Sequence, residues 1–299
     1  MKVSVSRYLK LLTSRVRQAA APADVLVGRL LLIGLGVLFL QLFLHGLSYS
    51  LGVTGLLSRG VTTEFWSAAL STPALPQSLL LSTLIAAAVT LLSLSGSLLM
   101  TARRYCCGRS RCLESAIWLS MAVPVIVAAT LIRFWLAPGG LIARILYHCG
   151  FLASPAEFPA LINDPYCIGI VLCGTFCSMP LLTLFQLRIQ ETDGLHLYAH
   201  AAVQLGASQL RAFTHVFLPM LIRRSRGMLL LTFLWNFSAW EAPLLLGRQS
   251  PRMISVLIQK SSGEFSLAQR PLGFVFSTVY FLVGVLAITI VSAKDRKHE

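Results

Sequence analysis

The residues best placed to do chemistry are two opposite charges inside otherwise apolar stretches. Glu241 lies in the run 227–246, and Arg133 lies in the run 115–137. A charge in hydrocarbon costs about 2.5–3.5 kcal/mol on insertion scales, so it normally faces a cavity or a partner. Three roles fit Glu241: an ion pair with Arg133, which lies at a similar predicted depth; contact with a cationic substrate, to which Trp240 would add cation–π attraction; or exposure near the lipid headgroups.

The other side chains predict no catalytic or metal site. Asn236, in the same run as Glu241, either lines a pathway or forms a hydrogen bond between helices. None of the seven cysteines belongs to a Cys-x-x-Cys pair, so neither a zinc site nor a redox site is expected. The glycine-rich pattern that binds the phosphates of ATP does not occur in the sequence. We therefore expect no cofactor and no catalytic residue on this chain, and any use of ATP falls to another chain.

The segment 188–226 differs from a simple tether because it is amphipathic. Two short helices fit on either side of Gly206, which can adopt the positive φ of a tight turn. Apolar residues recur at helical spacing on one face of each helix: Leu195, Tyr198, Ala202 and Leu205 in the first, and Leu210, Phe213 and Phe217 in the second. Such a face needs a partner, which is this protein's own helix ends, the membrane or another protein.

The same loop carries a spaced motif. His200-Ala201-Ala202 is followed after three residues by Gly206 and, after nine more, by Val216-Phe217-Leu218-Pro219. This spacing resembles the Glu-Ala-Ala, Gly, Ile-x-Leu-Pro pattern of the permease subunits of binding-protein-dependent ABC importers. Valine in place of isoleucine is conservative, and the unlike replacement is histidine for glutamate. A neutral imidazole offers no anion where the family has a fixed negative charge.

The resemblance implies a division of labour among several chains. Two permease subunits, identical or different, form the translocation pathway in the type I ABC importer permease fold. A dimer of cytoplasmic ABC ATPases receives the loop, and a periplasmic substrate-binding protein delivers the substrate. Within the loop, Ala201 and Ala202 would be small residues that allow close packing, and Gly206 would be the turn. Leu218-Pro219 would join the loop to the fifth membrane span.

Two further segments resemble one branch of this family. Residues 239–247 and 250–254 are similar to the end of the fifth span and its outer loop in permeases for polyamines, phosphonates and ferric iron. The resemblance therefore implies a polyamine such as spermidine or putrescine, a phosphonate, or iron as the substrate.

The elements that must position this loop are membrane helices. The chain of 299 residues is 56% hydrophobic and 12% charged, with a mean hydropathy of +0.75. Soluble domains average roughly 45–50% apolar and about 25% charged residues, so this chain has too little polar surface for a soluble protein. A net charge of +14 would suggest nucleic acid for a soluble chain. In an apolar chain it marks the cytoplasmic ends of membrane helices instead, and no nucleic-acid partner is expected.

Hydropathy predicts an all-α, polytopic membrane protein with six transmembrane helices. A spanning helix needs about 20 mostly apolar residues. The stretches that qualify are 30–51, 79–101, 115–137, 166–187, 227–246 and 272–293. The cytoplasmic segments of this topology carry 18 of the 25 Lys and Arg residues, and the external segments carry 6. Both termini are therefore expected in the cytoplasm. The resemblance implies that the membrane is the bacterial inner membrane.

This topology divides the chain into two parts. Residues 1–29 are predicted to form a basic cytoplasmic segment, and residues 30–299 a transmembrane permease domain that carries the coupling loop 188–226. A secondary transporter or channel, or an intramembrane enzyme, would be the alternative. A secondary transporter would be expected to carry more intramembrane acids than Glu241 alone, and an enzyme would need a clustered site. The loop motif therefore favours the importer permease.

Overall fold

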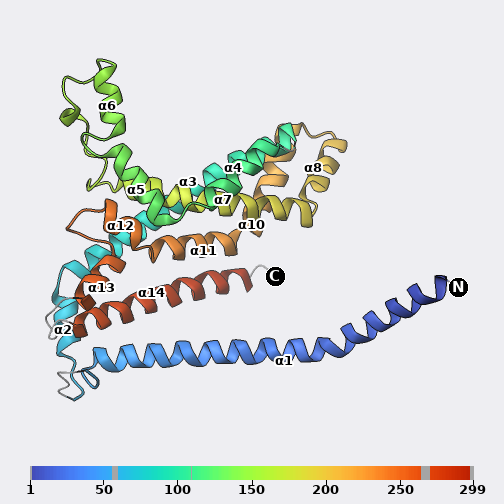
Figure 1. Cartoon of the computed structure of the whole chain (residues 1–299), viewed down its shortest axis with the longest axis horizontal. Helices are drawn as coiled ribbons and strands as arrows, with labels where there is room; N and C mark the ends of the chain where they lie inside the picture. The colour runs from blue at the N-terminus through green and yellow to red at the C-terminus, as the bar shows by residue number, and fades with distance from the viewer. Residues whose placement is uncertain (1, 56–59, 109, 264–269, 297–299) are drawn as a thin grey trace.

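The long helices of the protein run in roughly one direction, as the computed structural model shows (Figure 1). The structure describes residues 2–55, 60–108, 110–263 and 270–296; within these ranges, side chains are described from Leu26 to Ile290 and at Ala293. No strand occurs among these residues, in agreement with the predicted all-α class.

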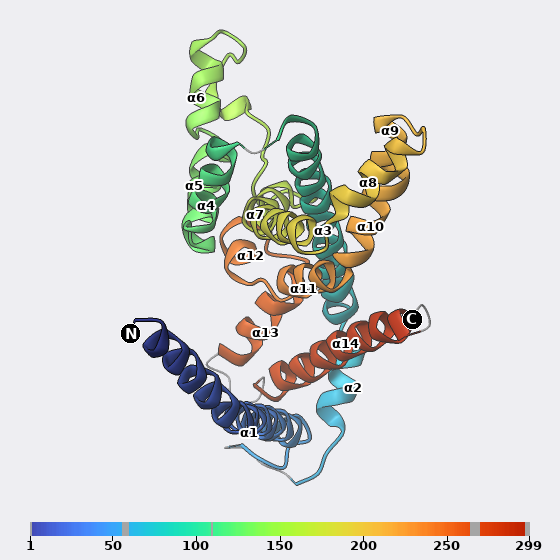
Figure 2. The ribbon, with the colours of Figure 1, turned by 90° about the vertical axis from the view of Figure 1, so that its right-hand side faces the viewer.

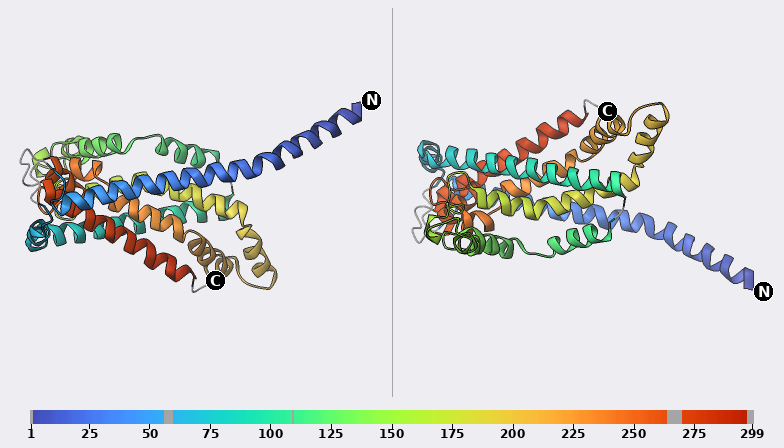
Figure 3. Two further views of the ribbon diagram at one scale, coloured as in Figure 1. Left: turned by 90° about the horizontal axis from the view of Figure 1, so that it is seen from below. Right: turned by 90° about the horizontal axis from the view of Figure 1, so that it is seen from above.

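Long helices alternate with clusters of short ones along the chain. In order, the elements are α1 (Lys2–Ser50), α2 (Glu64–Ser71), α3 (Ala74–Cys107), α4 (Arg111–Met121), α5 (Val125–Leu136), α6 (Leu141–His148), the 3-10 turn η1 (Pro155–Glu157), α7 (Ile168–Thr192), α8 (Leu195–Gln204), α9 (Gln209–Ala212), the π-helical turn η2 (Phe213–Phe217), α10 (Leu218–Arg224), α11 (Arg226–Phe237), α12 (Glu241–Leu246), α13 (Ile254–Gly263) and α14 (Arg270–Arg296). The helices α2, α12 and α13 gather at one end of the bundle, and α8, α9 and α10 gather at the other (Figures 1 and 3).

The centre of the bundle is the contact between α3 and α7, around which α4, α5, α11 and α12 are arranged (Figure 2). Gly96 of α3 lies directly against the side chain of Met179 of α7. Closer to the α8 end, the Thr101 hydroxyl donates a hydrogen bond to Gln186 Oε1 at 3.1 Å. Small residues let membrane helices approach closely, and hydrogen bonds across the helices add stability. Close packing at Gly96 and the hydrogen bond of Thr101 therefore both stabilise the contact between α3 and α7.

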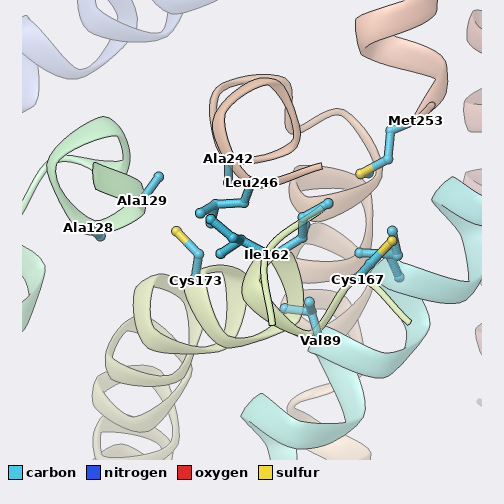
Figure 4. Close-up of a cluster of buried hydrophobic side chains, with 11 residues drawn as sticks. Val89, Ala128, Ala129, Ile162, Cys167, Cys173, Ala242, Leu246 and Met253 are labelled. Carbon is cyan, nitrogen blue, oxygen red and sulfur yellow. The ribbon is translucent and has the colours of Figure 1, made fainter. Parts of the chain in front are cut away.

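Two apolar cores hold the end of the bundle opposite α8. The first joins α3, α5, α7 and α12 (Figure 4). Its buried members are Ile85, Val89, Ala128, Ala129, Ile162, Cys167, Ile170, Cys173, Ala242, Leu246 and Met253. The second joins α2, α3, α11, α13 and α14 around Phe237 and Phe276. These cores fix the positions of α12 and α13, which contribute the outer cavity described below.

Within the described residues, five helical segments are long and apolar enough to cross a membrane. They are Leu26–Ser50, Ala74–Cys107, Val125–His148, Ile168–Thr192 and Arg270–Ile290. Four of them overlap the predicted spans at 30–51, 79–101, 166–187 and 272–293. The third overlaps only the second half of the predicted span 115–137. The predicted number of six is thus not confirmed.

The predicted span 227–246 is divided into two helices. The helix α11 ends at Phe237 and α12 begins at Glu241. In the turn between them, the carbonyl of Ala239 accepts a hydrogen bond from Ser255 Oγ at 2.5 Å. At 1.5 Å per residue, the 12 residues of α11 cover about 18 Å, which is shorter than the roughly 30 Å of a hydrocarbon core. A uniform apolar sequence therefore does not form one uniform helix here.

Two prolines within predicted spans act differently. Pro124 has an extended backbone with ψ of 147°, and it separates α4 from α5. Pro180 lies inside α7, which continues from Ile168 to Thr192. Proline removes one backbone donor, and neighbouring helices can accommodate this loss in a membrane protein. Pro124 therefore lies just before the start of α5, whereas α7 continues through Pro180.

The helix α1 lies on the outside of the bundle (Figure 1). It packs on α14 through the ring pairs Phe43–Phe281 and Tyr49–Phe274, whose centroids are 4.7 and 4.3 Å apart. Most of the leucines from Leu26 to Leu44 are exposed, including Leu32 at 70%. Exposed leucines along a whole helix are typical of a surface that faces lipid.

Candidate functional site

The loop between α7 and α11 folds into a compact helical unit that turns at Gly206. This glycine has a φ of +95°, which favours a residue without a side chain. Its N–H donates to the carbonyl of Val203, and the N–H of Ala207 donates to the carbonyl of Ala202, both at 3.0 Å. These two bonds form the Schellman arrangement that closes a helix at a left-handed glycine. Ser208 caps the next helix, α9, and its Oγ accepts from the N–H of Arg211 at 3.4 Å.

One side of this unit packs against the protein's own helix ends. Its buried members are Leu195, Ala199, Ala212, Phe217 and Leu221, and Leu98, Tyr105 and Ile189 of the long helices pack around them. The ring of Tyr105 in α3 lies 5.3 Å from that of Phe213 and 4.9 Å from that of Phe217. Part of the predicted apolar face is therefore covered from within the chain.

The other side of the unit is uncovered at its tip. Leu205 is 90% exposed and Leu210 is 72% exposed, one on each side of the turn at Gly206. Tyr198 is 56% exposed on α8. Large apolar side chains gathered on a polar loop indicate an interaction surface, since a tether gains nothing from them. We call Leu205, Gly206 and Leu210 the loop tip.

The remaining residues of the motif differ in their exposure to solvent. His200, Ala201 and Pro219 are exposed, whereas Ala202, Val216 and Leu218 are half-buried. Pro219 lies at the start of α10, where its missing N–H leaves no bond unmade. It therefore joins the loop to α10, a separate short helix, and α11 follows at Arg226.

A charged network that sequence reasoning did not find holds the base of the loop. Arg104 of α3 lies 2.9 Å from Glu114 of α4 and 2.6 Å from Glu191 of α7. Beside it, His196 and His200 line a cavity of about 350 Å³, with their rings 6.4 Å apart. Charged residues that lie far apart in the sequence leave no periodic pattern that would reveal their pairing. The signal that could have indicated this network is that all three residues lie near helix ends on the same predicted side of the membrane. Because one arginine joins three helices, the network orients the loop relative to the bundle.

The predicted pathway residues are not brought together as one group. Asn236 is buried, and its Nδ2 donates to Ser178 Oγ and to the carbonyl of Thr232, each at 2.8 Å. It thus links α11 to α7, which is the helix-to-helix role. Trp240 is 45% exposed in the turn before α12.

The predicted ion pair between Arg133 and Glu241 is not formed. The Arg133 guanidinium donates instead to the carbonyl of Leu245 at 2.9 Å. The cause is the break after α11. It makes Glu241 the first residue of α12, and it presents the unpaired carbonyls at the end of α12 to Arg133. A cation at a helix C-terminus is also favoured by the helix dipole.

Neutralising these two charges is therefore expected to give independent effects. The variants Arg133→Gln and Glu241→Gln, and the double variant, should change the free energy of unfolding additively within about 0.5 kcal/mol. Thermal unfolding of the purified chain in detergent measures this cycle. A coupling energy well above that limit would mean that the two side chains pair in the membrane after all.

The comparisons with known proteins agree with this geometry at the level of the fold. No known family profile matches the sequence, and no curated protein matches it. A solved structure does match: a bacterial ABC transporter involved in the import of the acidic polysaccharide alginate. The match has a TM-score of 0.72 at 13% sequence identity, and it covers 95% of this chain and 99% of that one. The chain therefore shares the fold of this transporter chain.

The fold places the loop tip at one end of the long helices and the α12–α13 region at the other (Figure 3). The likeness extends over nearly the whole chain. It is a likeness of fold, and it does not single out the branch for polyamines, phosphonates or iron. Among the described residues, no group of three or more His, Cys, Asp or Glu side chains could hold a metal ion.

Proposed function

We propose that this chain is a permease subunit of an ATP-driven ABC importer, and that its loop tip couples it to a cytoplasmic ATPase. The observation that carries the proposal is the pair of exposed leucines at the tip, Leu205 and Leu210, on a unit that is otherwise packed against α3 and α7. A groove on an ATPase would remove these leucines from water. Movement of the ATPase would then reach the membrane helices through Tyr105 and the Arg104 network.

The partners of this proposal are a dimer of ABC ATPases, a second permease subunit and a periplasmic substrate-binding protein, assembled at the bacterial inner membrane. An apolar groove of about 850 Å³ is lined by α4, α5, α7, α11 and α14. It would form one wall of the pathway, which the second subunit would complete. The residues Ser178 and Thr232, which bond to Asn236, also line it.

The substrate is the finer part of the proposal. The sequence resemblance favours a polyamine, a phosphonate or iron, and these differ in the sign of their charge. The solved neighbour is described as importing an acidic polysaccharide. The charge of the outer cavity, considered below, bears on this choice.

The test is co-expression of this chain with a candidate ATPase and a candidate second permease. We expect the ATPase to co-purify with the chain, and reconstituted vesicles to accumulate substrate only when ATP is hydrolysed. Uptake driven by an ion gradient without the ATPase would instead indicate a secondary transporter.

The proposed orientation can be tested with the protein's own exposed cysteines. Cys106 lies in the last turn of α3, at its inner end, and Cys149 follows α6 on the opposite side. In variants that keep one of them, a membrane-impermeant maleimide should label Cys149 in intact cells, and should label Cys106 only after the membrane is opened. The reverse pattern would place the loop tip outside and contradict the ATPase proposal.

A further inference from the structure

Positive charge is concentrated on one predicted external segment. Four of the six external Lys and Arg residues fall within 247–271, although external loops normally carry few. Three of them, Arg248, Arg252 and Lys260, line the same cavity of about 490 Å³ between α12 and α13. This volume is within the range of sites for small molecules. None of the described residues that line it is acidic.

The guanidinium of Arg248 is not neutralised by any carboxylate among the described residues. Its Nε is buried and has no hydrogen-bond partner there. The buried carboxylate of Asp164, in the turn before α7, accepts instead from the backbone N–H groups of Tyr166 and Ile168 at 3.1 Å. A buried donor without a partner costs about 1–3 kcal/mol, and such a group in a native protein calls for a ligand, an ion or a water.

The guanidinium of Arg252 is oriented but keeps its charge. Its Nε donates to the carbonyl of Gln249, and its terminal nitrogen donates to Gln249 Oε1, both at 2.6 Å. Both acceptors are neutral, so they fix the direction of the side chain without cancelling the positive charge. A planar guanidinium held in this way suits the paired oxygens of a carboxylate or phosphate.

The backbone around the cavity is held in place before any ligand binds. The N–H of Ile254, at the start of α13, donates to the buried Ser82 Oγ at 2.8 Å. The N–H of Asn163 donates to the carbonyl of Leu246 at 2.9 Å, which ties the end of α12 to the turn before α7. A frame fixed at both ends lowers the cost of ordering the site on binding.

We propose that this cavity binds a small anionic solute through Arg248 and Arg252, with carboxylate or phosphate groups as the recognised chemistry. The binding site itself stands on the geometry above. Its meaning for transport rests on the proposed importer function: the solute that enters from the outer face is an anion. Phosphonates fit this charge, and free polyamines do not.

Calorimetric titration of the purified full chain in a non-ionic maltoside detergent, which contains no phosphate, tests the site. The probes are citrate for carboxylates, pyrophosphate for phosphates and spermidine as a cation. We expect citrate or pyrophosphate to bind and spermidine not to bind. Arg248→Gln and Arg252→Gln should each weaken binding roughly tenfold or more, because each removes one charge-assisted contact. Arg144→Gln is the matched control, since it removes an exposed external arginine whose Nε bonds to the carbonyl of Gly139.

Three results would overturn the site. One is equal affinity in Arg248→Gln, Arg252→Gln and wild type, with all three monodisperse in size-exclusion chromatography. Another is binding of spermidine in place of the anions. The third is no anion binding, with the two variants weakening only the association of a delivery protein, which would assign the arginines to protein docking. Because the assay contains no ATPase, failure of the ATPase to co-purify would reject the importer function and leave anion binding intact.

Discussion

Replacing Leu205 by glutamate is expected to weaken the association with the ATPase about thirtyfold or more while leaving the permease folded. The side chain is 90% exposed and buries almost nothing in the isolated chain, so its replacement should change the free energy of unfolding by no more than about 0.5 kcal/mol. In a complex, the same position would bury an unpaired carboxylate in an apolar groove. Central interface residues cost about 2 kcal/mol or more when lost, which is roughly thirtyfold in Kd.

The measurement is the affinity of the purified chain for the ATPase, together with ATP-dependent uptake into vesicles. Leu70→Glu is the matched control, because Leu70 is 66% exposed on α2 at the opposite end of the bundle. It should bind the ATPase as wild type does. If Leu205→Glu and Leu70→Glu behave alike, the loop tip is not the docking surface.

Replacing Gly174 by leucine is expected to be the most damaging single change within the membrane region. A Cβ at this position of α7 would lie 2.8 Å from Asn236 Oδ1 and 2.9 Å from Val89 Cγ2, both of which are buried. The helices α3, α7 and α11 therefore meet where only a glycine fits. Overpacking costs typically about 1–3 kcal/mol, and here it also disturbs the hydrogen bond of Asn236 to Ser178.

Folded yield and the melting temperature in detergent measure this effect. Gly34→Leu on α1 is the control, because nothing lies within 4 Å of a Cβ at that position. The control should fold as wild type does, although both variants add the same apolar side chain. Equal melting temperatures for the two variants would show that α3, α7 and α11 do not pack closely at Gly174.

The sequence predicted those parts of the fold that depend on local composition. Helices form over the runs 30–51 and 79–101 because nothing in them interrupts the apolar pattern. The break after Phe237 was missed, since no proline or glycine lies between α11 and α12. It depends instead on tertiary contacts such as the bond from Ser255 to Ala239.

The candidate site shows the same limit. The turn at Gly206 followed from residue type, because a positive φ favours glycine. Which leucines would remain exposed did not follow, since the packed side of the loop is covered by Tyr105, which precedes the phenylalanines it contacts by more than 100 positions. The predicted ion pair of Arg133 with Glu241 was wrong for a related reason. It rested on matched depth in the membrane, which does not show that the backbone turns just before Glu241 and brings the carbonyl of Leu245 to Arg133.

The loop tip has one more consequence, for the thermodynamics of coupling. Between Leu205 and Leu210 the side chains are alanine, serine and glutamine, with Gly206 at the turn, so no formal charge is present. An association that rests on removing these leucines from water gains most of its free energy from the release of solvent. The affinity of such an association falls on cooling, and the burial of apolar surface gives it a negative heat-capacity change. Because no charge is involved, the affinity responds little to ionic strength. With an imidazole at His200 in place of a fixed anion, the transmission of force from the ATPase would depend on temperature more than on salt.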